Sequence, residues 1–193
     1  IARYSDGSPK GTLREPSAID LILGAAPKRT LSDDVAAIAW ACQRYLESGV
    51  TSTTDAWVEP GMPEAYIAAD KSGALSIDTN LFFLAQPDTW RSYSKDFVSF
   101  RSEIEALPST SHLSAKTIKF ICDGALSAGT AALLEPYLDD PQSTGLLIWS
   151  EDELIDAMVH FDALGFQIHA HAIGDAAIRQ ALNAIEAVTK INP

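Results

Sequence analysis

Hydrophobic and polar positions define two kinds of segment that alternate along the chain. Four short apolar or β-branched runs predict strands, at about residues 50–56, 77–85, 117–122 and 166–171. Around them, apolar residues recur at the spacing of amphipathic helices. The predicted helices cover residues 30–48, 63–72, 93–106, 150–164 and 175–189. Strands that alternate with helices are typical of βα units around a parallel sheet, so we expect an α/β fold.

The segment 125–150 interrupts this alternation. It is too polar and too irregular for a single helix or strand, and prolines interrupt it. Long connections of this kind are often functional, so we expect a lid. At its end, Ser150 and Glu153 have the spacing of a capping box, which predicts that a helix begins here.

Two of the chain's four histidines, His169 and His171, lie two residues apart in the last predicted strand. Side chains alternate along a strand, so both rings should share one face of a buried strand. Asp175 follows closely and is expected to cap the next helix. Imidazoles near the carboxyl end of a parallel strand lie where α/β proteins build sites. On the spacing alone, two core histidines bonded to the backbone explain the pattern equally well.

A lysine, Lys119, interrupts the apolar strand 117–122. Ile118 and Phe120 should face one way and Lys119 the other. Burying an ammonium is costly, so one interpretation is an edge strand with this lysine in water. The other is a buried lysine with a lowered pKa, whose neutral amine can react with carbon dioxide to give a metal-bridging carbamate. With His171 on the next strand, it would form part of a zinc-type site.

Composition excludes several classes of partner. The chain has 14 Lys and Arg against 26 Asp and Glu, a net charge of −12, and no basic cluster. We therefore expect no nucleic acid and no anionic membrane as a partner. No apolar run reaches the roughly 20 residues of a membrane span. The two cysteines, Cys42 and Cys122, are too few for a disulfide framework or a thiolate cage, which favours the cytoplasm.

Five stretches resemble the amidohydrolase superfamily, and most closely its family 3. They are residues 11–15, 48–56, 118–125, 134–137 and 171–177, which read GTLRE, SGVTSTTDA, IKFICDGA, LEPY and HAIGDAA. The resemblance implies a (β/α)8 barrel enzyme in which one or two divalent metals, with zinc expected first, activate water. That water attacks an amide-type carbon–nitrogen bond, other than a peptide bond, in a small-molecule substrate.

The resemblance also implies roles for single residues. Lys119 matches the lysine of the fourth barrel strand, which is often carboxylated and bridges the metals. His171 matches the metal-binding histidine of the fifth strand, and His169 lies deeper in the barrel as a supporting or core residue. Asp123 is expected to order the loop after the fourth strand, and Asp175 is expected to cap the helix after the fifth.

Several of the family's metal ligands have no counterpart in the sequence. These are the His-x-His pair of the first strand, the histidine of the sixth and the aspartate of the eighth. We therefore expect residues 1–193 to be one partial barrel domain, about strands two to five, from inside a longer protein. Such a piece cannot close a barrel, so it should have exposed sheet edges through which it can self-associate. Alone, it should hold a partial metal site or none, and be inactive.

Two other hypotheses remain open at this point. The parent could be a regulatory or binding protein built on an amidohydrolase barrel that has lost catalysis. A weaker alternative is a flavodoxin-like open sheet that binds a small ligand, because four parallel strands with helices suit that size. The second alternative leaves Lys119 unexplained.

Overall fold

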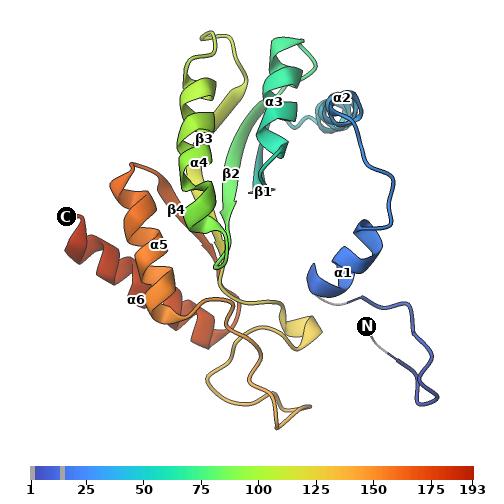
Figure 1. Cartoon of the computed structure of the whole chain (residues 1–193), viewed down its shortest axis with the longest axis vertical. Coiled ribbons are helices and arrows are strands. Elements are labelled where there is room, and N and C mark those ends of the chain that lie inside the picture. The colour runs from blue at the N-terminus through green and yellow to red at the C-terminus, as the bar shows by residue number, and fades with distance from the viewer. Residues whose placement is uncertain (1–2, 14–15) are drawn as a thin grey trace.

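The computed structural model describes residues 3–13 and 16–193 and contains one sheet covered by helices (Figure 1). The sheet has four strands in the order β1-β2-β3-β4, and each neighbouring pair is parallel. The strands are β1 (Ser52–Val58), β2 (Asp78–Ala85), β3 (Leu113–Ile121) and β4 (Gln167–His171). The helices are α1 (Pro16–Leu23), α2 (Leu31–Glu47), α3 (Met62–Lys71), α4 (Trp90–Glu105), α5 (Glu151–Ala163) and α6 (Asp175–Ile191). The predicted parallel α/β order is confirmed, whereas Arg14 and Glu15 of the GTLRE stretch lie outside the described residues.

The predicted starts of β3 and α4 differ most from the structure. Strand β3 begins at Leu113 rather than at 117, because Leu113 and Ser114 already pair with β2. Helix α4 begins at Trp90 rather than at 93. The carbonyl of Gln86 accepts hydrogen bonds from the first turn of this helix, including one from the Trp90 N–H at 3.0 Å. Both extensions depend on backbone pairing that the side-chain pattern does not encode.

The helix starts are defined by side chains that accept backbone hydrogen bonds. Thr30 and Asp33 form a complete capping box at α2, with each side chain bonded to the other residue's N–H. At α5, Ser150 accepts from the N–H of Glu153 as predicted. The carboxylate of Glu153 pairs instead with Arg91 on α4, at 3.0 Å. Only the Ser150 half of the predicted capping box is therefore present, because the Glu153 side chain is held in an ion pair with α4.

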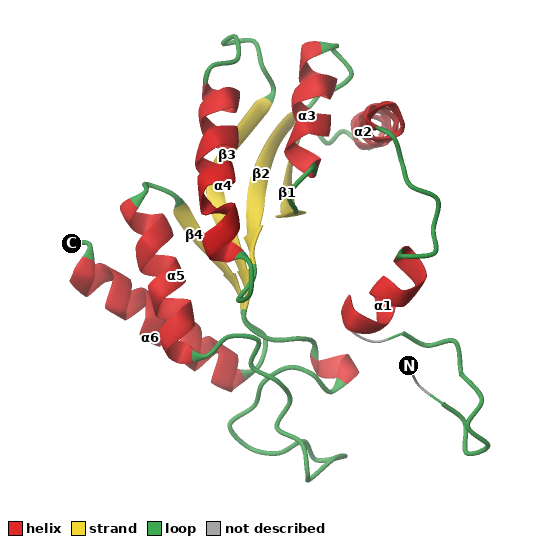
Figure 2. Cartoon of the chain, in the orientation of Figure 1, coloured by secondary structure: helices red, strands yellow, loops and turns green. Residues whose placement is uncertain are grey.

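The main hydrophobic core lies between the sheet and the helices that run along it (Figure 2). Phe83 of β2 stacks on Phe97 of α4, with ring centroids 5.1 Å apart. Phe120 of β3 and Phe161 of α5 extend the cluster, and all four rings are buried. Since alternate strand residues point into this core, the remaining ones, Lys119 among them, face the opposite side of the sheet.

The two outer strands leave the sheet open at both sides. Among the described residues, β1 pairs only with β2, and β4 pairs only with β3. None of the five residues of β4 is buried, so the expectation of a buried histidine strand is wrong. The physical reason is that, in the described part of the chain, no strand pairs with the outer side of β4. Open edges were expected of a partial barrel, and self-association through them stays a prediction. No helix in the described part of the chain is long and apolar enough to cross a membrane.

Both cysteines are buried free thiols, and burial raises the pKa of Cys122 to about 12. Because the thiolate is the reactive form, neither cysteine should react with a thiol reagent such as Ellman's reagent in the folded chain. Both should react fully in denaturant, which absorbance reports directly. Rapid labelling of Cys122 under native conditions would contradict the packing described for β3.

Candidate metal centre

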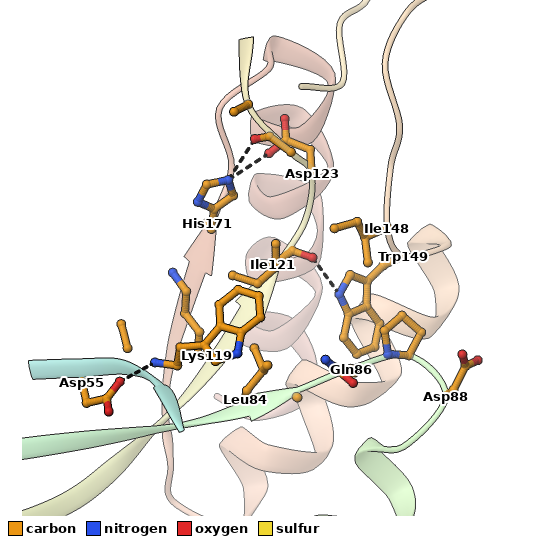
Figure 3. A pocket seen from close by; sticks show the side chains of 16 residues that line it. Asp55, Leu84, Gln86, Asp88, Lys119, Ile121, Asp123, Ile148, Trp149 and His171 are labelled. Carbon is orange, nitrogen blue, oxygen red and sulfur yellow. Dashed lines mark hydrogen bonds and ion pairs between the residues drawn. The ribbon is translucent and has the colours of Figure 1, made fainter. Parts of the chain in front are cut away.

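Strands β3 and β4 bring the sequence-predicted residues together on one face of the sheet. Lys119 is in register with His169, and Ile121 is in register with His171. The three polar side chains therefore share the face opposite the main core. Lys119 and His171 line a cavity of about 810 Å³ at the carboxyl ends of the strands, and Figure 3 shows the lysine pointing toward the imidazole. His169 lies nearer the amino end of β4, outside that lining, with its ring 5.0 Å from that of Phe82.

Lys119 lies on a central strand, and 7% of the residue is exposed. The alternative of an edge strand with a solvated lysine is therefore wrong. Burial lowers the pKa of Lys119, because the charged amine loses its hydration. Among the described residues its amine has no hydrogen-bond or ion-pair partner. An unpaired buried amine of this kind is more easily neutral than an ordinary lysine, and a neutral amine is a nucleophile and a base.

His171 is oriented by a backbone carbonyl. Its Nε2 lies 3.1 Å from the carbonyl oxygen of Gly124 (Figure 3). A carbonyl only accepts hydrogen bonds, so Nε2 carries the hydrogen and Nδ1 of a neutral ring keeps its lone pair. The ring is thus held by one nitrogen while the other is left available to a ligand. Partner groups that fix one imidazole nitrogen in this way are common behind metal-bound histidines.

Asp123 is fully buried and connects three separate parts of the chain. Its carboxylate accepts hydrogen bonds from the backbone N–H groups of Ala132 (2.9 Å), Ile173 (3.0 Å) and Gly174 (2.8 Å). It also lies 3.7 Å from Nε2 of His171. Both oxygens are engaged with loop backbone, which explains how the carboxylate orders the chain after β3. It is not free to bind a metal while these bonds persist.

Asp175 does not cap α6, so that expectation is wrong. The N-cap is Gly174, which makes no side-chain capping bond, and Asp175 is the first helical residue. The carbonyl of Ala132 accepts from the N–H of Ala176 at 3.1 Å and so takes the place of a capping side chain. The carboxylate of Asp175 accepts instead from the N–H of Leu134, at 2.8 Å. The loop 125–150 thus contacts the helix start directly.

Gly174 is required by this contact, because a Cβ there would overlap the carbonyl of Ala132. Gly174→Ala is expected to lower the free energy of unfolding by about 3 kcal/mol. Gly49→Ala is the matched control: its φ is +76° but nothing lies near the new methyl, so it should cost about 1 kcal/mol. Urea denaturation measures both values. Equal losses would show that Ala132 does not press on Gly174.

Hydrogen bonds join the loop 125–150 to the end of β3 and stabilise its path. Near its far end, the N–H of Ile148 donates to the carbonyl of Cys122, the residue that follows β3, at 2.9 Å. Within the loop, the Tyr137 hydroxyl donates to the carbonyl of Ala131 at 2.8 Å. Trp149 is buried, and its indole N–H donates to the carbonyl of Ile121 at 3.1 Å. Ala125, Ile148 and Trp149 of this segment line the cavity, and its role as a lid stays a prediction.

The sequence identified only part of the cavity wall. Trp57 lines the cavity, whereas Trp90 is buried in the main core and Tyr137 lines a separate hollow. Trp149 was missed, because a tryptophan just before a helix cap has no local pattern that marks it as a cavity residue. Its placement depends on the path of the whole loop.

The described residues supply only some of the ligands that a metal site needs. Lys119 and His171 offer an unpaired amine and a free imidazole nitrogen on adjacent strand ends. No group of three or more His, Cys, Asp or Glu side chains in the described part of the chain could hold a metal ion alone. The donor set therefore suits a divalent metal such as zinc, but needs further ligands to complete it.

Comparison with known proteins agrees with this fold. The sequence profile of the amidohydrolase family matches residues 1–193, and the chain belongs to that family. YtcJ of Bacillus subtilis (strain 168), whose name places it among the amidohydrolases, is 30% identical over 192 residues. The match covers 96% of this chain and 34% of YtcJ. LONG AFTER FAR-RED 3 of Arabidopsis thaliana is 28% identical over all of this chain and 33% of its own length.

Solved structures show the same architecture. An uncharacterized metal-dependent hydrolase from Pyrococcus horikoshii OT3 superposes with a TM-score of 0.73, at 26% identity, over 93% of this chain and 37% of that one. A second, from Pyrococcus furiosus, gives a TM-score of 0.76 at 24% identity, over 98% of this chain and 38% of that one. The chain therefore spans about a third of the length of the curated relatives it matches.

Proposed function

We propose that this chain is part of a metal-dependent hydrolase that cleaves an amide-type carbon–nitrogen bond, other than a peptide bond, in a small molecule. The observation that carries the proposal is the buried, unpaired Lys119 beside His171, whose Nδ1 is left free. A divalent metal bound there, with zinc as our first choice, would polarise the substrate carbonyl and activate water. Family membership and the hydrolase title of the Pyrococcus horikoshii protein support this choice of chemistry.

Each residue of the site has a stated task in this proposal. The neutral amine of Lys119 adds to carbon dioxide, forms a nitrogen–carbon bond and releases one proton, which leaves an anionic two-oxygen ligand. His171 offers Nδ1, while Gly124 holds the opposite nitrogen. Asp123 fixes the backbone that follows His171, at Ile173 and Gly174, and joins it to the loop at Ala132. His169 supports the strand rather than binding the metal, because its ring packs on Phe82 outside the cavity.

We further propose that other parts of a longer protein supply the remaining ligands, and that the isolated chain is inactive. Two donors do not make a hydrolytic metal site, which in proteins of this kind takes three or four. We propose a cytoplasmic location for that protein, because the two cysteines of this chain are free and buried. The open edges of β1 and β4 are where the isolated chain should associate with itself.

The test uses the complete protein and a panel of uncharged amides. We expect hydrolysis that is lost after treatment with a chelator and restored by zinc or another divalent ion. The isolated chain, assayed in parallel, should show neither hydrolysis nor stoichiometric metal. Hydrolysis by the chelator-treated protein, or by the isolated chain, would refute the proposal.

A second candidate is a regulatory protein that retains the barrel without catalysis. One relative, the exoenzymes regulatory protein AepA of Pectobacterium carotovorum subsp. carotovorum, is 26% identical over 99% of this chain and 40% of its own length. The intact pair of Lys119 and His171 favours the hydrolase for this chain. A complete protein that lacks metal and hydrolyses none of the amides would favour the regulator.

A further inference from the structure

An irregularity in β1 shapes the wall of the cavity beside Lys119. In the pairing of β1 with β2, Asp55 lies opposite Leu81 and Val58 lies opposite Phe83. Three steps on β1 therefore match two steps on β2, which is the signature of a β-bulge with one extra residue. Bulges of this kind are frequent next to active sites, where they re-aim a side chain.

The bulge changes which side chain faces the cavity. In a regular ladder, Trp57 would lie opposite Phe83 and point into the core between sheet and helices. The extra residue gives that place to Val58, which is fully buried. Trp57 is turned to the other side, where it lines the cavity with 44% of its surface exposed. A large apolar ring is thus presented to the site that holds Lys119 and His171.

Two side chains hold Trp57 in this arrangement. The carboxylate of Asp55 accepts from the Trp57 backbone N–H at 3.0 Å and from the Tyr66 hydroxyl at 2.7 Å. Burial raises the pKa of Tyr66, and the bond to Asp55 raises it further, so the hydroxyl remains a donor at neutral pH. The indole N–H of Trp57 donates to Glu59 at 3.1 Å, which fixes the ring itself. These bonds favour the orientation in which the ring faces the cavity.

The rest of the described wall is apolar, with few charges. Its apolar members include Leu84, Ile121 and Trp149. Within the described lining, Lys119 and His171 are the only basic groups, there is no arginine, and the acidic groups are Asp55, Asp88 and Asp123. If Lys119 and His171 are committed to a metal, no basic group of this wall is left for a substrate carboxylate. The wall favours an uncharged substrate.

We propose that Trp57 is a specificity-determining residue that seats a flat apolar group of an uncharged amide substrate. This inference rests on the proposed function, which places the amide at the metal. The bulge and the cavity lining independently indicate where the apolar group binds. An aromatic or similarly flat substituent stacks on the fixed indole, as aromatic side chains do on one another. With Lys119 and His171 bound to a metal, an acidic analogue of the same size finds no basic side chain of the described wall to pair with its carboxylate.

Binding to the complete protein tests the proposal without any catalytic step. Isothermal titration compares N-benzylacetamide, which is uncharged and aromatic, with acetamide and with N-acetylphenylalanine, which adds a carboxylate. We expect N-benzylacetamide to bind best, and Trp57→Ala to weaken it about tenfold. Trp57→Phe should lose less, because it keeps a flat ring. Trp40→Ala is the matched control, since this exposed tryptophan lies on α2 and outside the cavity lining, and it should bind as wild type does.

The outcomes separate this inference from the proposed function. Unchanged affinity in Trp57→Ala, or equal binding of the acid and the uncharged amide, would overturn the role of Trp57 even if the protein is a metal-dependent hydrolase. Conversely, if the protein shows the expected affinities but has neither metal nor hydrolytic activity, the role of Trp57 in binding an apolar group is upheld. Only the proposed hydrolysis is then refuted. Circular dichroism spectra of the variants confirm that each one is folded.

Discussion

Asp123→Ala is expected to lower the free energy of unfolding by about 3–5 kcal/mol, among the largest effects of any single change in this chain. The variant leaves three backbone N–H groups, from Ala132, Ile173 and Gly174, without their acceptor. Asp123 is fully buried, so water cannot replace the lost carboxylate without opening the loop. Urea denaturation followed by circular dichroism measures the change.

Asp175→Ala is the matched control for this prediction. Asp175 accepts a single bond, from the N–H of Leu134, and the residue is exposed, so its loss should cost about 1 kcal/mol or less. Both carboxylates contact the same loop, but only Asp123 joins that loop to both strand ends. If the two variants were equally stable, Asp123 would not be the centre of this network.

Lys119→Ala in the complete protein is expected to reduce metal-dependent amide hydrolysis at least about 100-fold. The change removes the amine that the proposal makes into a metal ligand, while the neighbouring apolar residues of β3 stay in place. Lys116→Ala is the control, because Lys116 lies on the same strand but is exposed. Steady-state kcat/KM for an uncharged amide, measured at saturating zinc, reports the difference.

Stability measurements keep this result interpretable. In the metal-free protein, removing the Lys119 amine breaks no hydrogen bond within the described chain, so Lys119→Ala should unfold at a urea concentration close to that of metal-free wild type. If Lys119→Ala is as active as Lys116→Ala, Lys119 has no role in the reaction. A variant that loses stability and activity together would instead assign Lys119 to the fold.

The sequence predicted the parallel α/β order well because alternation of strand and helix is a local property. The alternation of side chains along β3 also predicted correctly that Lys119 faces away from Ile118 and Phe120. The register of β3 against β4 then placed His169 and His171 on that same face. The hydrophobic pattern alone treated β4 as buried, whereas the expected partial barrel already implied an open sheet edge.

Features that depend on contacts between distant segments were missed. A Gly-Asp pair before a helix predicts a capping aspartate, yet the carbonyl of Ala132 occupies the capping position and Asp175 turns to the loop. The bulge that turns Trp57 into the cavity leaves no mark in the residue pattern of β1. The donors that reach Asp123 come from positions 9, 50 and 51 residues away, so the extent of its network was invisible in the sequence.

The most direct test of the central claim is the metal content of the complete protein, measured by mass spectrometry alongside His171→Ala and His112→Ala. Wild type should hold one or two divalent ions per chain, because Lys119 and His171 supply part of the site. His171→Ala should lose metal, whereas His112→Ala should keep it. His112 is exposed and paired with Asp78 at the amino ends of the strands, away from the cavity. Wild type without metal, or His171→Ala with its full content, would contradict the account.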